Sequence, residues 1–365
     1  MLQNERRSAV HAEAARIEAA FIKAGAMRIE ADALLDAETL LDLYGEDIRG
    51  RAYVTNDPVL GERMMRPDFT VPLVERHMAE GAEPARYCYN GPVWRMQESG
   101  SERASEYLQV GFELFAREEP SENDAEVFGL FSAVLPKNLS VTTGDFGLLF
   151  AAVQGLTISE FRRAALLRHL WRPKRFAALL DRFSKSGTND PHRSDLITKT
   201  MVMGAKVMIE DAGKFIGNRT EAEILARIDR LTKDAQEAPL REGEAEALHA
   251  LLNLSCPLST ATKALRKLDG ELKINTAVDA FEARVAALDR AGCDLDATNF
   301  AGSFGRTSME YYDGLVFAFS EGESVIASGG RYDALTRQIG DSREIPAVGG
   351  VIRPELLVDL GMAQC

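Results

Sequence analysis

The chain has 365 residues, of which 45% are hydrophobic and 27% are charged, an ordinary balance for a soluble globular protein of two or three structural units. Its formal net charge at pH 7 is −13, which argues against a surface that neutralises many phosphates, so we expect no nucleic-acid partner. The four cysteines are scattered and no apolar run has the length of a signal peptide or a membrane span. We therefore expect reduced thiols, no membrane association and a cytoplasmic location.

Residues 1–150 predict a unit that mixes helices and strands. The first segment predicts an amphipathic helix, because its apolar residues recur at helical spacing: Val10, Ala14, Ile17 and Phe21. Short strands follow, and a second helix is expected to begin after Thr70, where Pro72 falls in the first turn. A strand that ends near Asp145 completes this region.

The segment Arg86–Ala116 is the most informative part of the chain. Two aromatic-rich runs flank a polar stretch, 97–105, and this pattern predicts an antiparallel strand pair with a long connection. Side chains alternate between the two faces of a strand, so the second run has one apolar face: Leu108, Val110, Phe112 and Leu114. Its other face carries Tyr107, Gln109, Gly111, Glu113 and Phe115. Spacing alone leaves two interpretations open: a half-solvated strand, or the floor of a small-molecule pocket in which Gly111 leaves room for a ligand.

Residues 151–295 predict a mainly helical insertion. Alanine, leucine, arginine and glutamate dominate this region, and helical periodicity runs through 161–170 and 221–231. The arginine-rich stretch from Arg162 to Arg175 has two interpretations, a solvated helix face or an RNA contact. The acidic balance of the whole chain favours the solvated face.

Residues 296–365 return to strands. We expect strands at 310–319, 324–328 and 345–352, a turn at 329–333 that leads into a short helix, and a last helix opened by Pro354. Strands therefore lie at both ends of the chain with helices between them. This arrangement predicts an α+β fold with an antiparallel-rich sheet flanked by helices, not a doubly wound parallel sheet.

Several familiar chemistries are missing from the sequence. It contains no P-loop, no dinucleotide-binding glycine fingerprint and no zinc-protease or serine-hydrolase motif. The segment 141–145 (VTTGD) lacks an acidic pair directly upstream, so we interpret it as a strand end and not as a phosphate-binding loop. The five histidines are isolated from one another, and we expect neither a metal site nor a cofactor.

Four segments in order resemble the catalytic core of class II aminoacyl-tRNA synthetases, and specifically that of histidyl-tRNA synthetase. They are 65–70 (MRPDFT), the strand pair 86–116, 310–317 (EYYDGLVF) with 328–333 (SGGRYD), and 346–350 (PAVGG). The resemblance implies the synthetase-like antiparallel sheet. The chain ends soon after the last segment, so no anticodon-binding domain is expected.

The resemblance also implies a histidine-binding pocket. Asp68 stands where the synthetases have a glutamate that binds the substrate ammonium, and Thr70 and Gln109 accompany it. Arg95 matches the arginine that contacts the amino-acid carboxylate. Glu113 and Tyr312 match the pair that contacts the imidazole, and Tyr332 closes the pocket.

The residues that would bind ATP do not match the synthetase pattern. Thr307 occupies the position of a catalytic arginine, Gln97 that of the acid that holds adenine, and Ser105 that of a loop arginine. In the last segment the ATP-clamping arginine falls at Leu356, while Arg353 lies on a different face. Amino-acid activation needs cations placed on the developing phosphate charge, so we expect no catalytic residues and no catalysis by this chain.

A synthetase core that keeps its amino-acid pocket resembles the regulatory-subunit family of ATP phosphoribosyltransferase, the first enzyme of histidine biosynthesis. This resemblance implies a short-form catalytic subunit as partner, L-histidine as a feedback effector, and a homodimer within a hetero-oligomer. One alternative is a synthetase-like enzyme that adenylates histidine or another amino acid. Another is a free-standing histidine-binding module with a different partner.

Overall fold

The computed structural model describes residues 3–44, 46–97, 100–101, 104–185, 191–213, 218–306, 311–340 and 342–364. The chain forms two compact units. Unit 1 comprises Met1–Leu148, Asn253–Arg266 and Asn275–Cys365, and unit 2 comprises Leu149–Leu252 and Lys267–Ile274.

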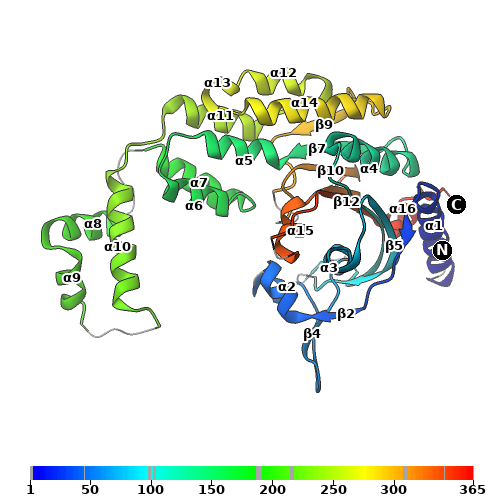
Figure 1. Cartoon of the computed structure of the whole chain (residues 1–365), viewed down its shortest axis with the longest axis horizontal. Helices are drawn as coiled ribbons and strands as arrows, with labels where there is room; N and C mark the ends of the chain where they lie inside the picture. Colours follow the sequence, from blue (N-terminus) through cyan, green and yellow to red (C-terminus); the bar gives the residue numbers. More distant parts are fainter. Residues whose placement is uncertain are drawn as a thin grey trace. The chain divides into compact units, whose positions relative to one another are not determined.

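A nine-stranded sheet, counted over the described residues, forms the centre of unit 1 (Figure 1). In spatial order its strands are β1 (Met27–Arg28), β5 (Ala85–Trp94), β6 (Glu106–Phe115), β12 (Ala347–Ile352), β11 (Ser324–Arg331), β10 (Leu315–Glu321), β7 (Ser140–Asp145), β9 (Thr298–Ala301) and β8 (Ser255–Pro257). The pairs β1–β5 and β7–β9 are parallel, and the other neighbours are antiparallel. The prediction of an antiparallel-rich sheet assembled from both ends of the chain is confirmed.

The predicted strand pair is confirmed as β5 and β6, which align from Ala85 opposite Phe115 to Trp94 opposite Glu106. The turn predicted at 329–333 is wrong, because β11 continues to Arg331 and pairs there with β12. Glycines in this strand permit close approach of the neighbouring strand β12 and do not mark a bend. A Cβ on Gly329 would lie 2.3 Å from the carbonyl oxygen of Gly349.

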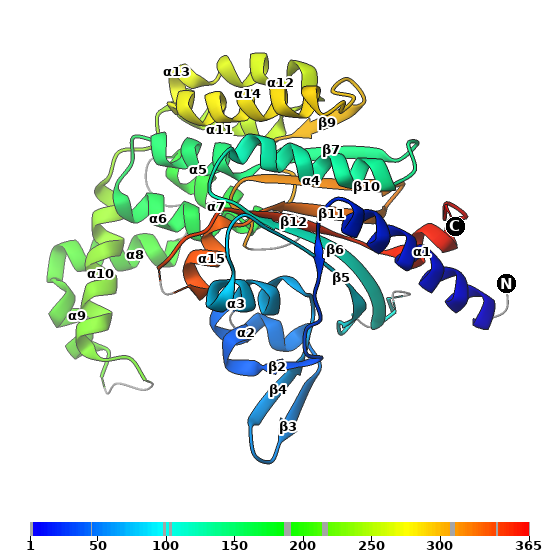
Figure 2. The ribbon, with the colours of Figure 1, turned by 45° about the vertical axis from the view of Figure 1, so that its right-hand side comes forward.

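Helices cover both faces of this sheet (Figure 2). On one face, Phe21 of α1 (Gln3–Lys23) contacts Phe112 of β6 and Phe131 of α4 (Pro120–Val134), with ring centroids 5.5 Å apart in each pair. On the other face, His77 of α3 (Thr70–Glu80) stacks on Phe115 of β6. The helices α15 (Asp333–Ile339) and α3 lie on this second side, and α16 (Pro354–Asp359) follows the last strand.

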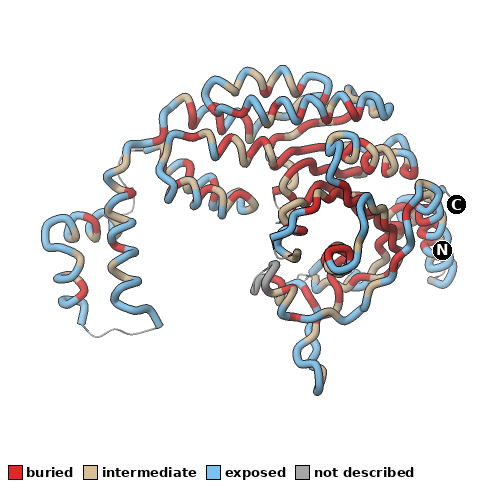
Figure 3. Tube along the Cα trace, viewed as in Figure 1, coloured by how far each residue is buried: buried red, intermediate tan, exposed pale blue. Residues whose placement is uncertain are grey.

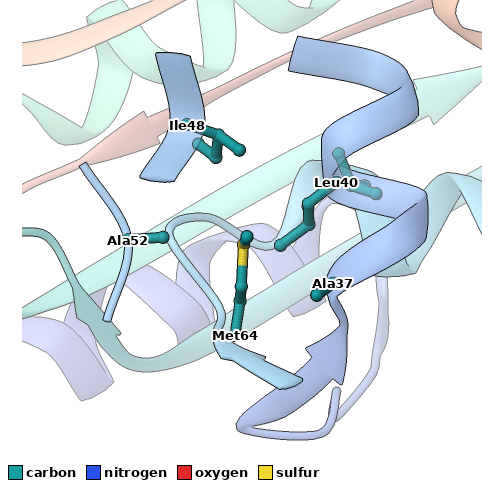
Figure 4. Packing of buried hydrophobic residues seen from close by; sticks show 6 residues of the cluster. Ala37, Leu40, Ile48, Ala52 and Met64 are labelled. Atoms are coloured by element: carbon teal, nitrogen blue, oxygen red, sulfur yellow. The ribbon is translucent and has the colours of Figure 1, made fainter. Parts of the chain in front are cut away.

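A smaller sheet of β2 (Leu34–Asp36), β4 (Gly61–Met65) and β3 (Val54–Asp57) completes the N-terminal part. Its hydrophobic cluster includes Leu40 of α2 (Ala37–Tyr44), Ile48 of the 3-10 helix η1 (Glu46–Gly50), and Met64 of β4 (Figure 4). The connection between β3 and β4 exposes apolar side chains: Val59 is 89% exposed and Leu60 is 64% exposed.

A buried ionic network joins α4 to the C-terminal part of unit 1. Asp124 of α4 accepts hydrogen bonds from Arg284 Nε (2.6 Å) and Arg331 Nη2 (2.6 Å), and Arg284 also pairs with Asp145. Arg284 lies on α14 (Asn275–Arg290), which packs against α4, and α14 also packs against α12 (Leu258–Arg266). Residues 253–266 and 275–295, which the sequence analysis assigned to the insertion, therefore belong with the core, because these charged and apolar contacts tie them to it.

Unit 2 is built from helices among the described residues. They are α6 (Glu160–Arg168), α7 (Pro173–Phe183), α8 (Pro191–Met203), α9 (Ala205–Asp211), α10 (Glu221–Gln236), α11 (Glu242–Asn253) and α13 (Asp269–Leu272), together with most of α5 (Phe146–Gly155). Figure 3 shows the strands of the central sheet as largely buried, whereas in α8, α9 and α10 exposed and intermediate residues predominate. None of the helices described in the structure combines the length and apolar character needed to cross a bilayer.

Arginines 162 to 175 do not form one uniform face. Arg168, Arg172 and Arg175 are exposed, as the solvated interpretation expects, but Arg162 is only 5% exposed. The solvated interpretation is therefore wrong for Arg162, which pairs with Asp234 of α10 inside unit 2.

Candidate functional site

The predicted site residues line one pocket on the α3 side of the sheet. The lining includes all seven predicted positions: Asp68, Thr70, Arg95, Gln109, Glu113, Tyr312 and Tyr332. Tyr311 and three residues of β12, Gly349, Gly350 and Val351, complete it. These residues come from distant parts of the sequence, and they meet because β12 and β11 lie beside β6 in the sheet.

Glu113 is among the most enclosed polar groups of the pocket, with 1% of its surface exposed. Its Oε2 accepts a hydrogen bond of 2.6 Å from the Tyr332 hydroxyl. Its Oε1 accepts longer hydrogen bonds from Thr70 Oγ1 (3.2 Å) and the Tyr89 hydroxyl (3.3 Å). Three hydroxyl donors thus hold this carboxylate in one orientation.

Burial raises the pKa of Glu113 to about 8, and the nearby charge of Asp68 acts in the same direction. The hydrogen bonds from Tyr332, Thr70 and Tyr89 oppose this rise, because they stabilise the charged form. A cationic or N–H-bearing ligand would lower the cost of ionising Glu113. The pocket is therefore electrostatically suited to such a ligand.

The other polar groups of the pocket are fixed by the backbone around them. Asp68 precedes α3, is 5% exposed, and its Oδ1 accepts a hydrogen bond of 3.4 Å from the Val71 N–H. Arg95 follows β5, and its Nε donates to the Pro67 carbonyl oxygen (2.8 Å). Gln109 lies on β6 with 1% exposure, and its Oε1 is buried without a hydrogen-bond partner. An unmatched buried acceptor marks a position that a ligand donor can occupy.

The interpretation of β6 as a half-solvated strand is wrong, because Gln109 and Glu113 face the interior of unit 1. Helix α3 covers this face, so both faces of the strand are buried. The pocket interpretation assumed that the space beside Gly111 is open to a ligand, and this assumption is wrong. The ring of Tyr89, its partner across the strand pair, fills it, and a Cβ on Gly111 would lie 2.1 Å from that ring.

Among the site residues that were not predicted from the sequence, two lie directly against Glu113. Tyr89 contacts Glu113 directly and stacks on Phe69, with ring centroids 4.3 Å apart. Gly349 lies opposite Glu113, and a Cβ there would lie 1.5 Å from Glu113 Oε2. The register of the strand pair could have revealed Tyr89, because it sets Tyr89 across from Gly111 on the face that carries Glu113.

The positions that depart from the synthetase pattern make other contacts. The Gln97 amide donates to the carbonyl oxygens of Arg95 (3.2 Å) and Ala104 (3.3 Å), and the Ser105 carbonyl oxygen accepts from the Arg95 N–H. Arg353 Nη1 donates to the Val325 carbonyl oxygen (3.1 Å). Thr307 lies outside the described residues. Within the part of the chain that the structure describes, no group of His, Cys, Asp and Glu side chains is arranged to hold a metal ion.

A family model and named relatives match most of the chain. The histidyl-tRNA synthetase family model matches residues 2–241 and 224–357. A relative from Rhizobium rhizogenes, named ATP phosphoribosyltransferase regulatory subunit, is 33% identical over 341 residues, which cover 88% of this chain and 90% of that protein. A relative of the same name from Rhizobium johnstonii is 30% identical over 364 residues and covers 91% of this chain and 92% of that protein.

Solved structures share the fold. A crystal structure of an ATP phosphoribosyltransferase regulatory subunit/histidyl-tRNA synthetase from Bacillus halodurans C superposes with a TM-score of 0.69 at 20% identity, covering 97% of this chain and 79% of that chain. Histidyl-tRNA synthetase from Nostoc sp. PCC 7120 gives a TM-score of 0.64 at 16% identity, covering 98% of this chain and 73% of that chain. The predicted α+β fold of the class II synthetase type is confirmed.

Proposed function

Because the chain belongs to the family of ATP phosphoribosyltransferase regulatory subunits, within the histidyl-tRNA synthetase family, we propose that it binds L-histidine in the pocket around Glu113 and thereby regulates a catalytic partner. The observation that carries this proposal is the buried, three-fold hydrogen-bonded Glu113 carboxylate beside an unmatched Gln109 oxygen.

The chemistry of histidine complements each wall of the pocket. Its ammonium would lie near Asp68 and the unmatched Gln109 Oε1, and its carboxylate near the Arg95 guanidinium. Its imidazole N–H would donate to Glu113, whose other contacts come from Tyr332, Thr70 and Tyr89. Hydrogen bonds to charged groups each contribute about 1.5–3 kcal/mol, so a few of them suffice for a specific amino-acid site.

In this proposal the chain does not activate histidine itself. The carboxylate and cations that the synthetases place on ATP are replaced at Gln97, Ser105, Thr307 and Leu356. Gln97 instead donates to main-chain carbonyl groups. Each missing cationic contact to a reacting phosphate costs orders of magnitude in rate, and several are missing.

The partner in this proposal is a short-form ATP phosphoribosyltransferase catalytic subunit, whose activity depends on this chain and is inhibited by histidine through it. We further propose a homodimer of this chain within the hetero-oligomer. The exposed Val59 and Leu60 between β3 and β4 are compatible with a protein contact. Light scattering of the purified chain, alone and with the catalytic subunit, measures both assemblies.

Glu113→Gln tests the pocket. The substitution keeps the shape of the side chain but removes the anionic acceptor, so we expect histidine to bind about 10- to 150-fold more weakly, the equivalent of about 1.5–3 kcal/mol. Isothermal titration calorimetry measures the dissociation constant, and Glu106→Gln, on the exposed end of the same strand, is the control. Equal histidine affinity in Glu113→Gln and the wild type would contradict the assignment.

The alternative function, adenylation of histidine or another amino acid, rests on the retained pocket and on Arg95, which lines it. Exchange of radiolabelled pyrophosphate into ATP by the purified chain separates the two. We expect no amino-acid-dependent exchange, and robust histidine-dependent exchange would overturn the regulatory proposal.

A further inference from the structure

The first turn of α15 has no capping side chain of its own. The residue at its N-cap position is Tyr332, whose side chain makes no hydrogen bond to the helix. The Tyr332 hydroxyl donates to Glu113 in the pocket instead. Helices are usually capped by a short side chain with an acceptor oxygen, such as that of aspartate or serine. The first N–H groups of α15 therefore need an acceptor from another part of the chain.

Asp313 supplies this acceptor. Its Oδ1 accepts a hydrogen bond of 3.1 Å from the Asp333 N–H, and its Oδ2 accepts one of 2.5 Å from the Ala334 N–H. These residues are the first two of α15, where the helix dipole also favours a negative charge. Asp313 directly follows Tyr312 in the sequence. Its carboxylate therefore joins two segments that each carry a tyrosine of the pocket.

The segment 312–314 also packs closely on the end of β11. The Asp313 N–H donates to the carbonyl oxygen of Arg331 at 3.0 Å. A Cβ on Gly330 would lie 2.8 Å from the Tyr312 ring, and a Cβ on Gly314 would lie 2.9 Å from Arg331 Cδ. Glycine at both positions thus lets the two segments approach, and the Asp313 carboxylate fastens them together.

We propose that Asp313 is a positioning residue of the pocket around Glu113, because it holds the Tyr312 segment against the segment that carries Tyr332. The inference rests on the proposed function, since it concerns the affinity of the same pocket for histidine. Asp313 acts through the two tyrosines and not by contact with the ligand. Because Asp313 caps α15, the N-cap position can be occupied by a tyrosine whose hydroxyl serves Glu113.

The charge of Asp313 provides a readout of this role. Burial and the neighbouring carboxylate of Asp333 raise the pKa of Asp313 to about 7, while the two N–H donors and Arg331 oppose the rise. Arg331 is held in turn by Asp124. The ionised carboxylate can accept from both N–H groups, whereas the neutral carboxyl group keeps one good acceptor oxygen. An asparagine at this position resembles the neutral form.

A purely structural role for Asp313 makes a different prediction. If Asp313 only stabilised α15, weakening this helix at another point would reduce histidine binding to the same extent. Thr336→Val is the matched test. The buried Thr336 hydroxyl bonds to the backbone of Asp333 and Ile345, and not to the segment 312–314.

Calorimetric titration of the full chain with histidine at pH 8.5 and pH 5.5 tests the proposal. At pH 8.5 we expect Asp313→Asn to bind histidine about tenfold or more weakly than the wild type, and Thr336→Val to bind less than about threefold more weakly. At pH 5.5, where Asp313 is neutral, the difference between Asp313→Asn and the wild type should shrink to about threefold or less. The titrations of Glu113 and of histidine affect both proteins alike and cancel in this ratio.

Glu13→Gln is the control for the loss of a carboxylate. Glu13 is a buried glutamate of α1 that pairs with Arg16, and the variant should bind histidine as the wild type does at both pH values. Circular dichroism checks that each variant is folded. If Asp313→Asn does not fold, Asp313→Ser, which also keeps one acceptor oxygen, takes its place with the same expected ranking.

Three results would overturn the inference while leaving the histidine site itself in place. These are equal affinity of Asp313→Asn and the wild type at pH 8.5, an equally large loss in Thr336→Val, or a ratio of affinities that does not change with pH. The absence of histidine binding by the wild type would instead refute the proposed function, and this inference with it.

Discussion

At the residue scale, the Glu113 carboxylate is governed by three hydroxyl donors of unequal strength. The Tyr332 hydroxyl lies 2.6 Å from Oε2, whereas the Tyr89 hydroxyl lies 3.3 Å from Oε1. Short hydrogen bonds to a charged acceptor are the stronger ones. The two tyrosines should therefore contribute unequally to histidine binding although both touch the same side chain.

We expect Tyr332→Phe to weaken histidine binding by at least tenfold and Tyr89→Phe by about fivefold or less, given typical hydrogen-bond contributions of about 1.5–3 and about 1 kcal/mol. Calorimetric dissociation constants of both variants measure the difference. Both substitutions keep the ring, so circular dichroism should show unchanged folding. A larger effect from Tyr89→Phe would contradict the hydrogen-bond geometry as the cause.

The raised pKa of Glu113 predicts a specific pH dependence of stability. The pKa is about 8 in the folded chain and about 4.5 for an ordinary glutamate, so between these values the folded state binds a proton that the unfolded state has lost. The contribution of Glu113 to the free energy of unfolding therefore falls as the pH rises through this window, by up to about 1.4 kcal/mol per pH unit, and levels off above about pH 8.

Urea unfolding of the wild type and Glu113→Gln between pH 5 and pH 8.5 measures this contribution, because the variant cannot titrate at position 113. The stability of the wild type relative to the variant should decrease steadily with pH. A constant difference would mean that Glu113 titrates near its ordinary value.

Residue-scale prediction from sequence succeeded where a family motif or a strand period applied. The alternation along β6 placed Gln109 and Glu113 on one face, and the structure places both in the same pocket. It did not reveal Tyr89 or Gly349, because their roles depend on cross-strand neighbours. Gly111 was assigned to ligand space for the same reason: the side chain that fills its space belongs to another strand.

At the element scale, Asp124 joins α4 to β11, the strand that directly precedes the pocket residue Tyr332. Arg331, which donates to Asp124, directly precedes Tyr332, and Arg284 connects the same carboxylate to α14. Asp313 directly follows Tyr312 and accepts hydrogen bonds from the backbone N–H groups of Asp333 and Ala334, and Asp333 also accepts a hydrogen bond from Arg331. The two tyrosine-bearing segments are thus attached to one buried polar network.

Asp124→Asn should destabilise the protein by about 3–5 kcal/mol, because it leaves Arg284 and Arg331 buried without their shared anion. Glu122 lies on α4 like Asp124, and Glu122→Gln removes its exposed ion pair with Arg290 of α14. This substitution should lower the free energy of unfolding by no more than about 1 kcal/mol. Urea unfolding measures both changes. Similar small losses in the two variants would show that the network does not hold the elements together.

Element prediction was most accurate where local pattern and tertiary packing agree. The amphipathic period of α1 and the two aromatic runs of β5 and β6 each predict the observed element. Gly329 and Gly330 signal a turn by composition, but cross-strand pairing with β12 keeps them extended. Helices α12 and α14 resemble the insertion in composition, and only their packing partners assign them to unit 1.

At the scale of the whole molecule, regulation and support of a catalytic partner should be separable. In the proposed complex, Glu113→Gln alters the ligand pocket without altering the surface of the chain. We therefore expect the variant to activate a short-form ATP phosphoribosyltransferase catalytic subunit as the wild type does, while histidine no longer inhibits the complex at concentrations that inhibit the wild type.

Steady-state rates with and without histidine test this separation, with Glu106→Gln as the control for a charge change on the same strand. Full inhibition of the complex that contains Glu113→Gln would show that histidine acts elsewhere. The surfaces through which the chain would contact its partners could not be predicted from the sequence, since charge and composition exclude classes of partner but do not specify a contact surface.

The position of β12 has a consequence for biosynthesis. This strand, 347–352, is the last to be synthesised among the described strands, yet it lies between β6 and β11 in the sheet. Until it leaves the ribosome, the growing chain presents an unpaired edge of β6, and Glu113 has no Gly349 opposite it. Strand pairings this distant in sequence form slowly and expose apolar surface meanwhile. A nascent chain should therefore be most prone to aggregation before β12 pairs with β6 and β11, and any ligand of the pocket around Glu113 can stabilise only the complete sheet.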